Sequence, residues 1–424
     1  MTQDLSFNQA SQWLTWLEQQ HPSHEIDMGL ARIGEVSKRL LRDAPIAKQV
    51  ITVAGTNGKG SSVAFLTSIL DQAGLNYASL TSPHFVRFNE RIQLQGLPID
   101  DAALCASFER VNRARFNGAG EATTLTYFEF NALLAFDIMQ RADLDVAVLE
   151  IGLGGRLDAV NLIDADVSIV TSIAIDHVDW LGDNIDLIGR EKAGIYRRHK
   201  PAIVGAVDCP ASVADYAHEI DAQCFKNGVD FKVENGFWSN SSGLSLKLPN
   251  TCLPHMNMAA VVQAIHCLTF DIAEQDIITG LANARLMGRF QRLEWQGKQL
   301  ILDVAHNPQA AKNMAVTLAR EPCEGKTIAV LAMLGDKDYQ QVIAELSSTF
   351  DHWMLATSQG VRGLPSQELA RQTAKQGVGH SQVDTYDTPA EAFEHAVDMA
   401  SDQDRIIVFG SFVTVGEVLS IVET

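Results

Sequence analysis

The feature that most constrains the fold is a strand, a glycine-rich loop and a helix that follow one another between residues 50 and 73. β-Branched residues dominate Val50–Ala54, which indicates a buried strand, and apolar residues recur at helical spacing after the loop. The loop itself, GTNGKGS at 55–61, differs from the common GxxxxGKS pattern, since Val53 stands at the first glycine position and a glycine separates the lysine from the serine. Glycines let backbone N–H groups approach an anion, and a helix start favours negative charge. This order of strand, glycine-rich loop and helix predicts an α/β sheet with a nucleotide-phosphate site. A purely structural glycine turn is the alternative.

Composition bounds the class of protein. A chain of 424 residues predicts two or three domains, and a formal charge of −19, from 52 acidic and 33 basic residues, argues against nucleic acid or an anionic membrane as partner. We see no secretory signal at the N-terminus and no run of about 18 apolar residues. Six cysteines without CxxC spacing indicate reduced thiols. We therefore expect a cytoplasmic enzyme. We also expect it to act as a monomer on small molecules.

Polar residues follow several predicted strands of this sheet. Apolar runs predict strands at 77–80, 145–150 and 167–173. Because the carboxyl ends of parallel strands meet at one edge of a sheet, we expect Ser82, Glu150 and His177 to lie near the glycine loop, with Glu150 placed to hold magnesium. The alternatives are a proline turn for Ser82, a surface carboxylate for Glu150 and a core histidine for His177. Lys192, on a predicted helix at 186–195, would ordinarily be a surface cation.

Further along, Thr126 and Glu129 have the spacing of a capping box at the start of a helix over 127–139. The pattern also predicts a helix at 211–224, hairpins within 231–248, and a helix at 258–268 that opens with Asn257.

A second parallel-sheet domain is predicted after residue 287. Strand and helix patterns alternate anew from Leu300, with strands at 300–304, 327–334, 352–356 and 405–409. We expect a P-loop ATPase domain at 1–287, a hinge at 288–297 and a smaller Rossmann-like domain at 298–424. Polar clusters end the strands of both domains, so an active-site cleft between them is expected. No GxGxxG occurs in the second domain, which argues against NAD.

The motifs together resemble the Mur-ligase superfamily and, within it, the folate ligases that have both dihydrofolate synthase and folylpolyglutamate synthase activity. They occur in the family's order from about residue 27 to 310 and read GTNGKGS, TSPH, LTYFE, LEIGLGGRLDA, SIAIDHVDWLG, GREKAGI, GRFQ and DVAHNP. The resemblance implies an ATP-dependent amide ligase. ATP would convert the carboxylate of dihydropteroate or of a tetrahydrofolate into an acyl phosphate, and the amine of L-glutamate would then displace the phosphate.

Residue roles follow from the resemblance alone. It implies ATP contacts from Gly55, Thr56, Asn57, Gly58, Lys59, Gly60, Ser61, Asn257, Arg289 and Asp303. It implies two Mg²⁺ ions bound by Ser82, Glu150 and His177. It implies catalytic roles for Lys59, Lys192 and His306. It implies a pterin site formed by Asp27, Met28, Gly29, Leu30, Thr126, Tyr127, Phe128, Glu129, Leu157, Asp158 and Ala159.

Two of these assignments carry a physical argument or an alternative, and the second domain adds candidates for a glutamate site. The resemblance implies that Lys192 is carbamylated, which fits the physics, because Mg²⁺ repels an ammonium but accepts carbamate oxygens. Tyr127 and Phe128 could instead be helix core. For L-glutamate, Lys337 and Ser411 of the second domain are candidates, with solvated loops as the simpler reading.

Three rival functions remain. One is a monofunctional folylpolyglutamate synthase. Another is a cell-wall Mur ligase, disfavoured because only 49 residues precede the first strand, too few for a domain that binds a nucleotide sugar. The third is a nucleotide-dependent switch without ligase chemistry, which would leave Lys192, Arg289 and Asp303 unexplained.

Overall fold

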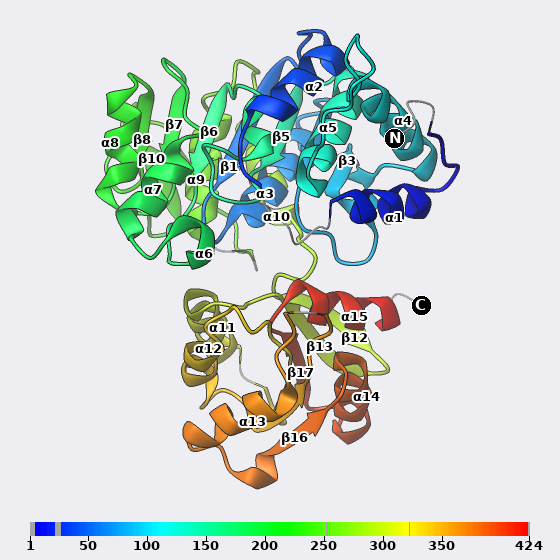
Figure 1. Ribbon diagram of the computed structural model, residues 1–424. Helices are drawn as coiled ribbons and strands as arrows, with labels where there is room; N and C mark the ends of the chain where they lie inside the picture. Colours follow the sequence, from blue (N-terminus) through cyan, green and yellow to red (C-terminus); the bar gives the residue numbers. More distant parts are fainter. Residues whose placement is uncertain are drawn as a thin grey trace. The chain divides into compact units, whose positions relative to one another are not determined.

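The computed structural model describes residues 5–21, 27–251, 253, 255–321, 323–360 and 362–422. These residues form two compact units. The first comprises the chain up to Pro83 together with Asn89–Ala284, and the second comprises His84–Phe88 and the chain from Arg285 onward. Each unit is a mainly parallel sheet flanked by helices (Figure 1), so the predicted α/β fold class is confirmed.

The first unit contains an eight-stranded sheet in the order β4-β3-β2-β5-β1-β6-β7-β8. From β2 to β8 neighbouring strands are parallel, whereas β3 and β4 add an antiparallel edge. All of β1 is buried, as expected for a central strand with helices on both faces. The strands are β1 Gln49–Ala54, β2 Tyr77–Leu80, β3 Ile92–Leu94, β4 Leu97–Pro98, β5 Val146–Glu150, β6 Val167–Val170, β7 Pro201–Val204 and β8 Gln223–Lys226.

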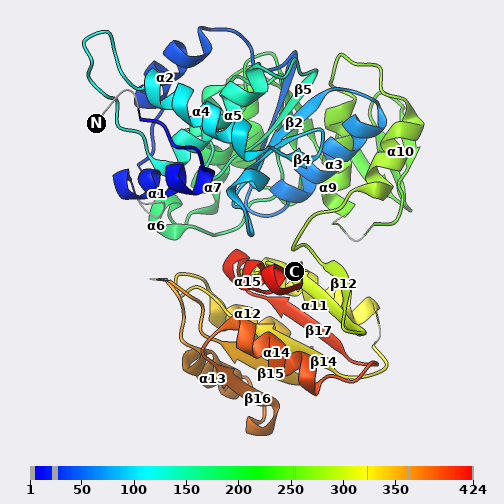
Figure 2. The same cartoon turned by 90° about the vertical axis from the view of Figure 1, so that its right-hand side faces the viewer.

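Helices cover this sheet in two layers, which are visible in Figure 2. One layer consists of α3 Lys59–Gln72, α9 His255–Ile265 and α10 Glu274–Asn283, and the other of α2 Ala31–Leu41, α4 Asp101–Ala114 and α5 Tyr127–Gln140. Helix α1 (Ala10–Gln20) packs on α4, where Trp13 stacks on Phe108 at 5.2 Å. Helices α7 (Ile185–Ala193) and α8 (Ala211–Glu219) pack together, and α6 (Val178–Leu181) is a single turn. A small antiparallel sheet, β9 Phe231–Glu234, β10 Phe237–Asn240 and β11 Ser245–Lys247, confirms the predicted hairpins.

Two local predictions in this unit are wrong. The helix predicted at 211–224 ends at Glu219, and the chain reverses at Asp221, which has a φ of 56°, before residues 223–226 join the sheet as β8. A short strand directly after a helix carries too few residues for its period to be told from the helix pattern. Asn257 lies inside α9, which begins at His255, and does not open it.

The second unit has a six-stranded sheet in the order β12-β13-β17-β14-β15-β16, parallel except for β12. The stretch 288–297, predicted as a hinge, contains β12, which pairs antiparallel with β13. The strands are β12 Gln291–Trp295, β13 Lys298–Asp303, β14 Thr327–Leu331, β15 His352–Ala356, β16 Val383–Tyr386 and β17 Arg405–Phe409.

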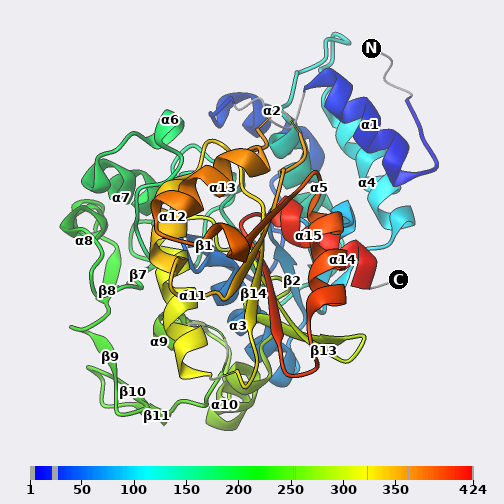
Figure 3. The same cartoon turned by 90° about the horizontal axis from the view of Figure 1, so that it is seen from below.

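Alternate residues of these strands pack into two separate hydrophobic cores, one on each face of the sheet. In β14, Ala329 and Leu331 pack with the layer of α11 (Pro308–Arg320), α12 (Tyr339–Leu346) and α13 (Ser366–Lys375). Ile328 and Val330 pack with α14 (Pro389–Met399) and α15 (Phe412–Val422) on the other face (Figure 3). This two-residue period explains the continuous apolar strands.

Among the described residues the free thiols are Cys105, Cys209, Cys224, Cys267 and Cys323, and Cys252 lies outside the described residues. None of the helices in the described ranges combines the length and the hydropathy of a membrane span.

Candidate nucleotide and substrate site

The glycine loop between β1 and α3 is pressed against neighbouring side chains. Gly58 has a φ of 94°, and a Cβ added there would lie 2.6–2.9 Å from the amide group of Asn257. A Cβ on Gly55, where φ is 145°, would lie 1.9 Å from the Thr171 hydroxyl. Both positions therefore require glycine. Such a loop, placed before a helix start, fits a phosphate group in the way the sequence predicts.

The segment after β6 fixes the loop from one side. Thr56 N–H donates to Ser172 O at 2.7 Å, and the Thr56 hydroxyl exchanges hydrogen bonds with the backbone of Ala174 at 3.0 and 3.1 Å. The Thr171 hydroxyl donates to Asn57 O at 2.7 Å. Thr171 and Ser172 are not among the predicted site residues, although both lie at the end of a predicted strand, as the other candidates do.

Asn257 fixes the loop from a second side. Its buried amide donates to the Ser61 hydroxyl at 2.8 Å, and the Ser61 hydroxyl donates to Gly58 O at 3.1 Å. Gly60 lies in the first turn of α3. The structure thus brings Asn257 against the loop Gly55–Ser61, and the ATP contacts of these residues stay a prediction.

Two lysines converge on one carbonyl of the loop. Lys59 Nζ donates to Gly55 O at 3.0 Å, and Lys192 Nζ donates to the same oxygen at 3.1 Å. Lys192 is only 5% exposed, so it is not the surface cation that its sequence context alone suggested. Burial, followed by the charge of Lys59, lowers the pKa of Lys192 to about 7. A large share of its amines is therefore neutral at physiological pH.

Of the three residues expected as metal ligands, Glu150 is the last residue of β5, and Ser82 and His177 follow β2 and β6. These strands and β1 are consecutive and parallel in the order β2-β5-β1-β6, so their carboxyl ends share one edge. Glu150 is buried, and the backbone N–H of Ser82 donates to Glu150 Oε2 at 3.4 Å. His177 begins α6, with its side chain 42% exposed and its Nε2 atom 3.9 Å from Asp176 Oδ2.

The donor set of this edge suits a hydrated ion. Within the part of the chain that the structure describes, no three His, Cys, Asp or Glu side chains form a ready-made metal cage. Magnesium usually keeps several waters and is held by one or two carboxylates together with substrate phosphates. A buried carboxylate, Glu150, at the same sheet edge as the glycine loop fits that kind of site.

The three stretches expected at the pterin site meet at the turn 152–155. A Cβ on Gly152 would lie 2.5 Å from the Phe128 ring, so the ring packs directly on this backbone. Gly154 approaches Met28 and Leu181, each 3.4 Å from an added Cβ. Gly155 lies against the backbone of α7, where the carbonyl of Lys192 would be 2.7 Å away. The turn therefore joins the stretches predicted for the pterin site to the helix that carries Lys192.

Asp158 is held rigidly beside this turn. It is 4% exposed, its carboxylate accepts from Leu153 N–H and from Val160 N–H at 2.8 Å each, and it caps the 3₁₀ turn Ala159–Leu162. Burial raises the pKa of Asp158 to about 6, and the backbone hydrogen bonds act in the opposite direction. Leu157 is half-buried next to it. Backbone hydrogen bonds therefore fix the position of this buried carboxylate.

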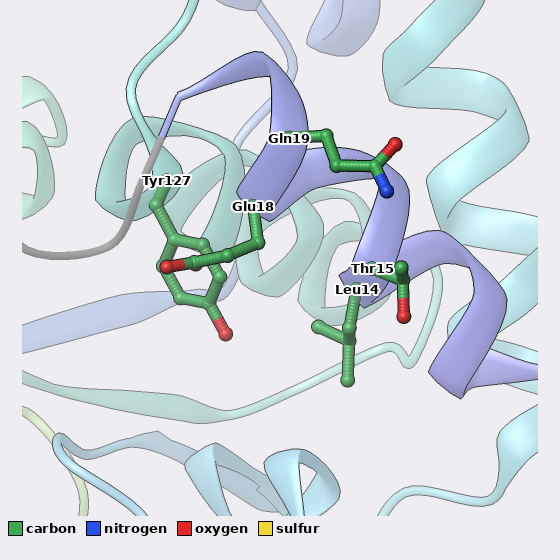
Figure 4. A pocket seen from close by; sticks show the side chains of 5 residues that line it. All are labelled: Leu14, Thr15, Glu18, Gln19 and Tyr127. Carbon is green, nitrogen blue, oxygen red and sulfur yellow. The ribbon is translucent and has the colours of Figure 1, made fainter. Parts of the chain in front are cut away.

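Helix α5 begins with the predicted capping box, which is confirmed by the two hydrogen bonds between Thr126 and Glu129. Tyr127 turns towards α1, where Figure 4 shows its ring beside Glu18. The hollow there measures about 430 Å³ and is lined by Leu14, Thr15, Glu18, Gln19 and Tyr127. Tyr127 and Phe128 are both half-buried.

The second unit gathers its own predicted residues at the end of β13. The Asp303 carboxylate accepts from Phe290 N–H at 2.8 Å and from Ala305 N–H at 2.7 Å. Burial raises the pKa of Asp303, whereas the nearby Arg289 lowers it. The Arg289 guanidinium lies 5.5 Å from the centre of the Phe412 ring, and His306 Nδ1 is 2.7 Å from Val304 O.

The two candidates for a glutamate contact differ. The buried Ser411 hydroxyl accepts from Thr414 N–H at 3.0 Å at the start of α15, which is the role of a helix cap. Lys337 is half-buried in the loop after β14.

Comparison with known proteins agrees with this architecture. The Mur ligase middle domain matches residues 53–248, and the Mur ligase glutamate ligase domain matches residues 288–412. The dihydrofolate synthase/folylpolyglutamate synthase of Escherichia coli (strain K12) is 41% identical over 417 residues, covering 97% of this chain and 95% of the relative. The structure of E. coli FolC in complex with DHPP and ADP superposes with a TM-score of 0.90, at 40% identity and 98% coverage of both chains. A bifunctional folylpolyglutamate synthase/dihydrofolate synthase with Mn, AMPPNP and L-glutamate bound gives 0.90 at 38% identity and 100% coverage of both. The resemblance seen in the motifs is confirmed: the chain belongs to the Mur ligases and, among them, to the dihydrofolate synthase/folylpolyglutamate synthase family.

Proposed function

We propose that this protein is an ATP-dependent amide ligase that adds L-glutamate to dihydropteroate and to reduced folates. One observation carries the proposal: the glycine loop, the buried carboxylate of Glu150 and the acceptor stretches around turn 152–155 lie along one edge of one sheet. A relative solved with DHPP and ADP, and another with Mn, AMPPNP and L-glutamate, support this choice of ligands.

The chemistry requires activation of a carboxylate, because a free carboxylate is a poor electrophile. Transfer of the γ-phosphoryl group of ATP to the carboxylate gives an acyl phosphate and ADP, and attack by the amine of L-glutamate forms the amide and releases phosphate. Glycine-loop N–H groups and Lys59 would neutralise the charge on the transferred phosphoryl group. Asp158 and Phe128 would hold the pterin end of the acceptor, and Arg289, Asp303 and His306 would contact the nucleotide or the acyl phosphate.

Two Mg²⁺ ions would be held by Ser82, Glu150 and His177 and would screen the phosphate charge. Lys192 would serve as a carbamate, because carbamate oxygens are better ligands for Mg²⁺ than an ammonium is. Its pKa of about 7 supports this assignment, because only a neutral amine reacts with carbon dioxide.

The direct test is glutamate incorporation. Purified protein would be supplied with ATP, Mg²⁺ and radiolabelled L-glutamate, and with either dihydropteroate or tetrahydrofolate. We expect label in both acceptors, together with acceptor-dependent release of phosphate. Label in tetrahydrofolate alone would identify a monofunctional folylpolyglutamate synthase, and ATP hydrolysis that ignores the acceptor would favour a nucleotide switch.

A matched pair of lysine variants ties the activity to the site. Lys59→Met should lower incorporation by about 10²- to 10³-fold, the usual effect of losing one donor to a developing charge. Lys48→Met is the control, because Lys48 is exposed, pairs with Asp145 and precedes the opposite end of the same strand, β1. Equal activity in the two variants would remove the assigned role of the glycine loop.

A further inference from the structure

Arg32, in the first turn of α2, links two of the acceptor stretches. Its Nε atom lies 2.9 Å from both carboxylate oxygens of Glu129, its Nη1 atom bonds the Asp27 carboxylate, and its Nη2 atom donates to Asp27 O at 2.6 Å. The Arg32 side chain is 31% exposed, whereas that of Glu129 is 4% exposed. A single guanidinium therefore connects the loop 27–30 with the start of α5.

Glu129 is a fixed anchor for this connection. The same carboxylate accepts from Thr126 N–H at 2.8 Å, and Glu129 N–H donates to the Thr126 hydroxyl at 3.1 Å. A capping box of this kind holds the first turn of a helix in one geometry. Asp27, in contrast, is exposed and bonds Arg32 through both its side chain and its backbone. Arg32 thus holds the loop 27–30 to the fixed first turn of α5.

Each partner of Arg32 carries a neighbour that contacts the glycine turn. Phe128, next to Glu129, packs on Gly152, and Met28, next to Asp27, approaches Gly154. The separation between these two neighbours depends on the guanidinium between Asp27 and Glu129. Arginine suits this task, because its planar fork binds two groups in fixed directions, which a lysine cannot do.

We propose that Arg32 is a positioning residue that sets the width of the acceptor site and thereby its affinity for the pterin substrate. The proposal rests on the proposed function, since it concerns the same site. Arg32 contacts the groups that flank the acceptor and acts through them. Its loss should therefore weaken binding of the acceptor and leave binding of ATP largely intact.

The test compares Arg32→Gln and Arg32→Lys with Arg110→Gln. Arg110 is a matched control, because it is 30% exposed and bonds the buried Asp137 carboxylate through Nε and Nη2 at 2.7–3.0 Å. Asp137 lies on the same helix as Glu129, about 12 Å further along at 1.5 Å per residue. Both glutamine variants remove one ion pair to a buried carboxylate of α5, and Asp137 keeps a second ion pair with Arg141. Only the pair of Arg32 and Glu129 borders the acceptor site.

The readouts are the KM values for dihydropteroate, tetrahydrofolate and ATP, the Kd for dihydropteroate measured by calorimetry, and the urea midpoint. We expect Arg32→Gln to raise the acceptor KM and Kd about tenfold and to change the ATP KM by less than about twofold. Arg32→Lys should lie in between and serves as the test if the glutamine variant does not fold. Arg110→Gln should lower the urea midpoint without raising the acceptor KM.

Two results would overturn the inference: an unchanged acceptor KM and Kd in the Arg32 variants, or an equal rise in Arg110→Gln. Failure of the proposed function would look different. In that case the unmodified protein itself would neither bind dihydropteroate nor incorporate glutamate, and the inference would fall with it.

Discussion

Replacing Lys192 with methionine should stabilise the apoprotein while it abolishes turnover. The Lys192 amine is buried, lies near Lys59 and hydrogen-bonds Gly55 O. Methionine has a similar length and no charge to bury, so the substitution removes an unfavourable group from the folded state. The same substitution removes the amine that the proposed carbamate requires, and incorporation of glutamate should collapse.

The pH dependence gives the magnitude. The pKa of Lys192 is about 7 in the folded state, against 10.5 for an ordinary lysine. Since the folded pKa is the lower one, the unfolded chain binds more protons between these values, and the free energy of unfolding rises with pH across the window. At 1.36 kcal/mol per pKa unit, Lys192 alone lowers the free energy of unfolding by about 4 kcal/mol at pH 7 and by about 2 kcal/mol at pH 9. After subtracting about 1 kcal/mol for the lost hydrogen bond, Lys192→Met should be about 3 kcal/mol more stable than the unmodified protein at pH 7. This advantage should shrink by about 2 kcal/mol at pH 9.

Urea unfolding followed by circular dichroism at pH 7 and pH 9, in bicarbonate-free buffer without nucleotide, measures this difference. Lys48→Met is again the control: its hydrogen bond to Asp145 raises the pKa of Lys48, so this group does not titrate in the window. Parallel pH dependence of stability in Lys192→Met and the unmodified protein would refute the assignment of a neutral, buried amine.

Three further predictions concern the same edge of the sheet. Gly58→Ala should raise the ATP KM by about tenfold or more in initial-rate assays, because a Cβ there meets the Asn257 amide; an unchanged KM would show that the loop can yield. Thr171→Val removes hydroxyl hydrogen bonds to the backbone of the glycine loop and should cost about 1–3 kcal/mol in urea unfolding, with weaker ATP binding; a purely local effect would leave the ATP KM as it was. The folded pKa of Asp158, about 6, exceeds the ordinary value of 3.8, so this group favours the folded state below pH 4 and loses that contribution as pH rises through 6. Asp158→Asn should remove about 3 kcal/mol of this pH dependence, and equal slopes of the urea midpoint against pH would contradict the burial of the charge.

Much of the architecture could be predicted because its signals are local. The strand, loop and helix around Gly55–Ser61 lie within one short stretch, and so does the capping box of Thr126 and Glu129. The edge shared by Ser82, Glu150 and His177 followed from one rule about parallel strands. Local patterns failed where an element was short. The predicted helix at 211–224 runs into β8, and β12 lies in a stretch predicted to be a hinge.

The sequence by itself determined the fold class, the phosphate loop and the family, because period, glycine spacing and motif order are properties of the chain. Only the tertiary structure decided which side chains are buried and what they touch. Lys192 meets Gly55 across 137 residues, Arg32 meets Glu129 across 97, and Asn257 meets Ser61 across 196. A pKa or an ion pair depends on the groups packed around it, and such contacts leave no periodic trace in the sequence. For that reason Lys192 could pass for a surface cation and Arg32 for an unremarkable helix residue until the fold brought their partners to them.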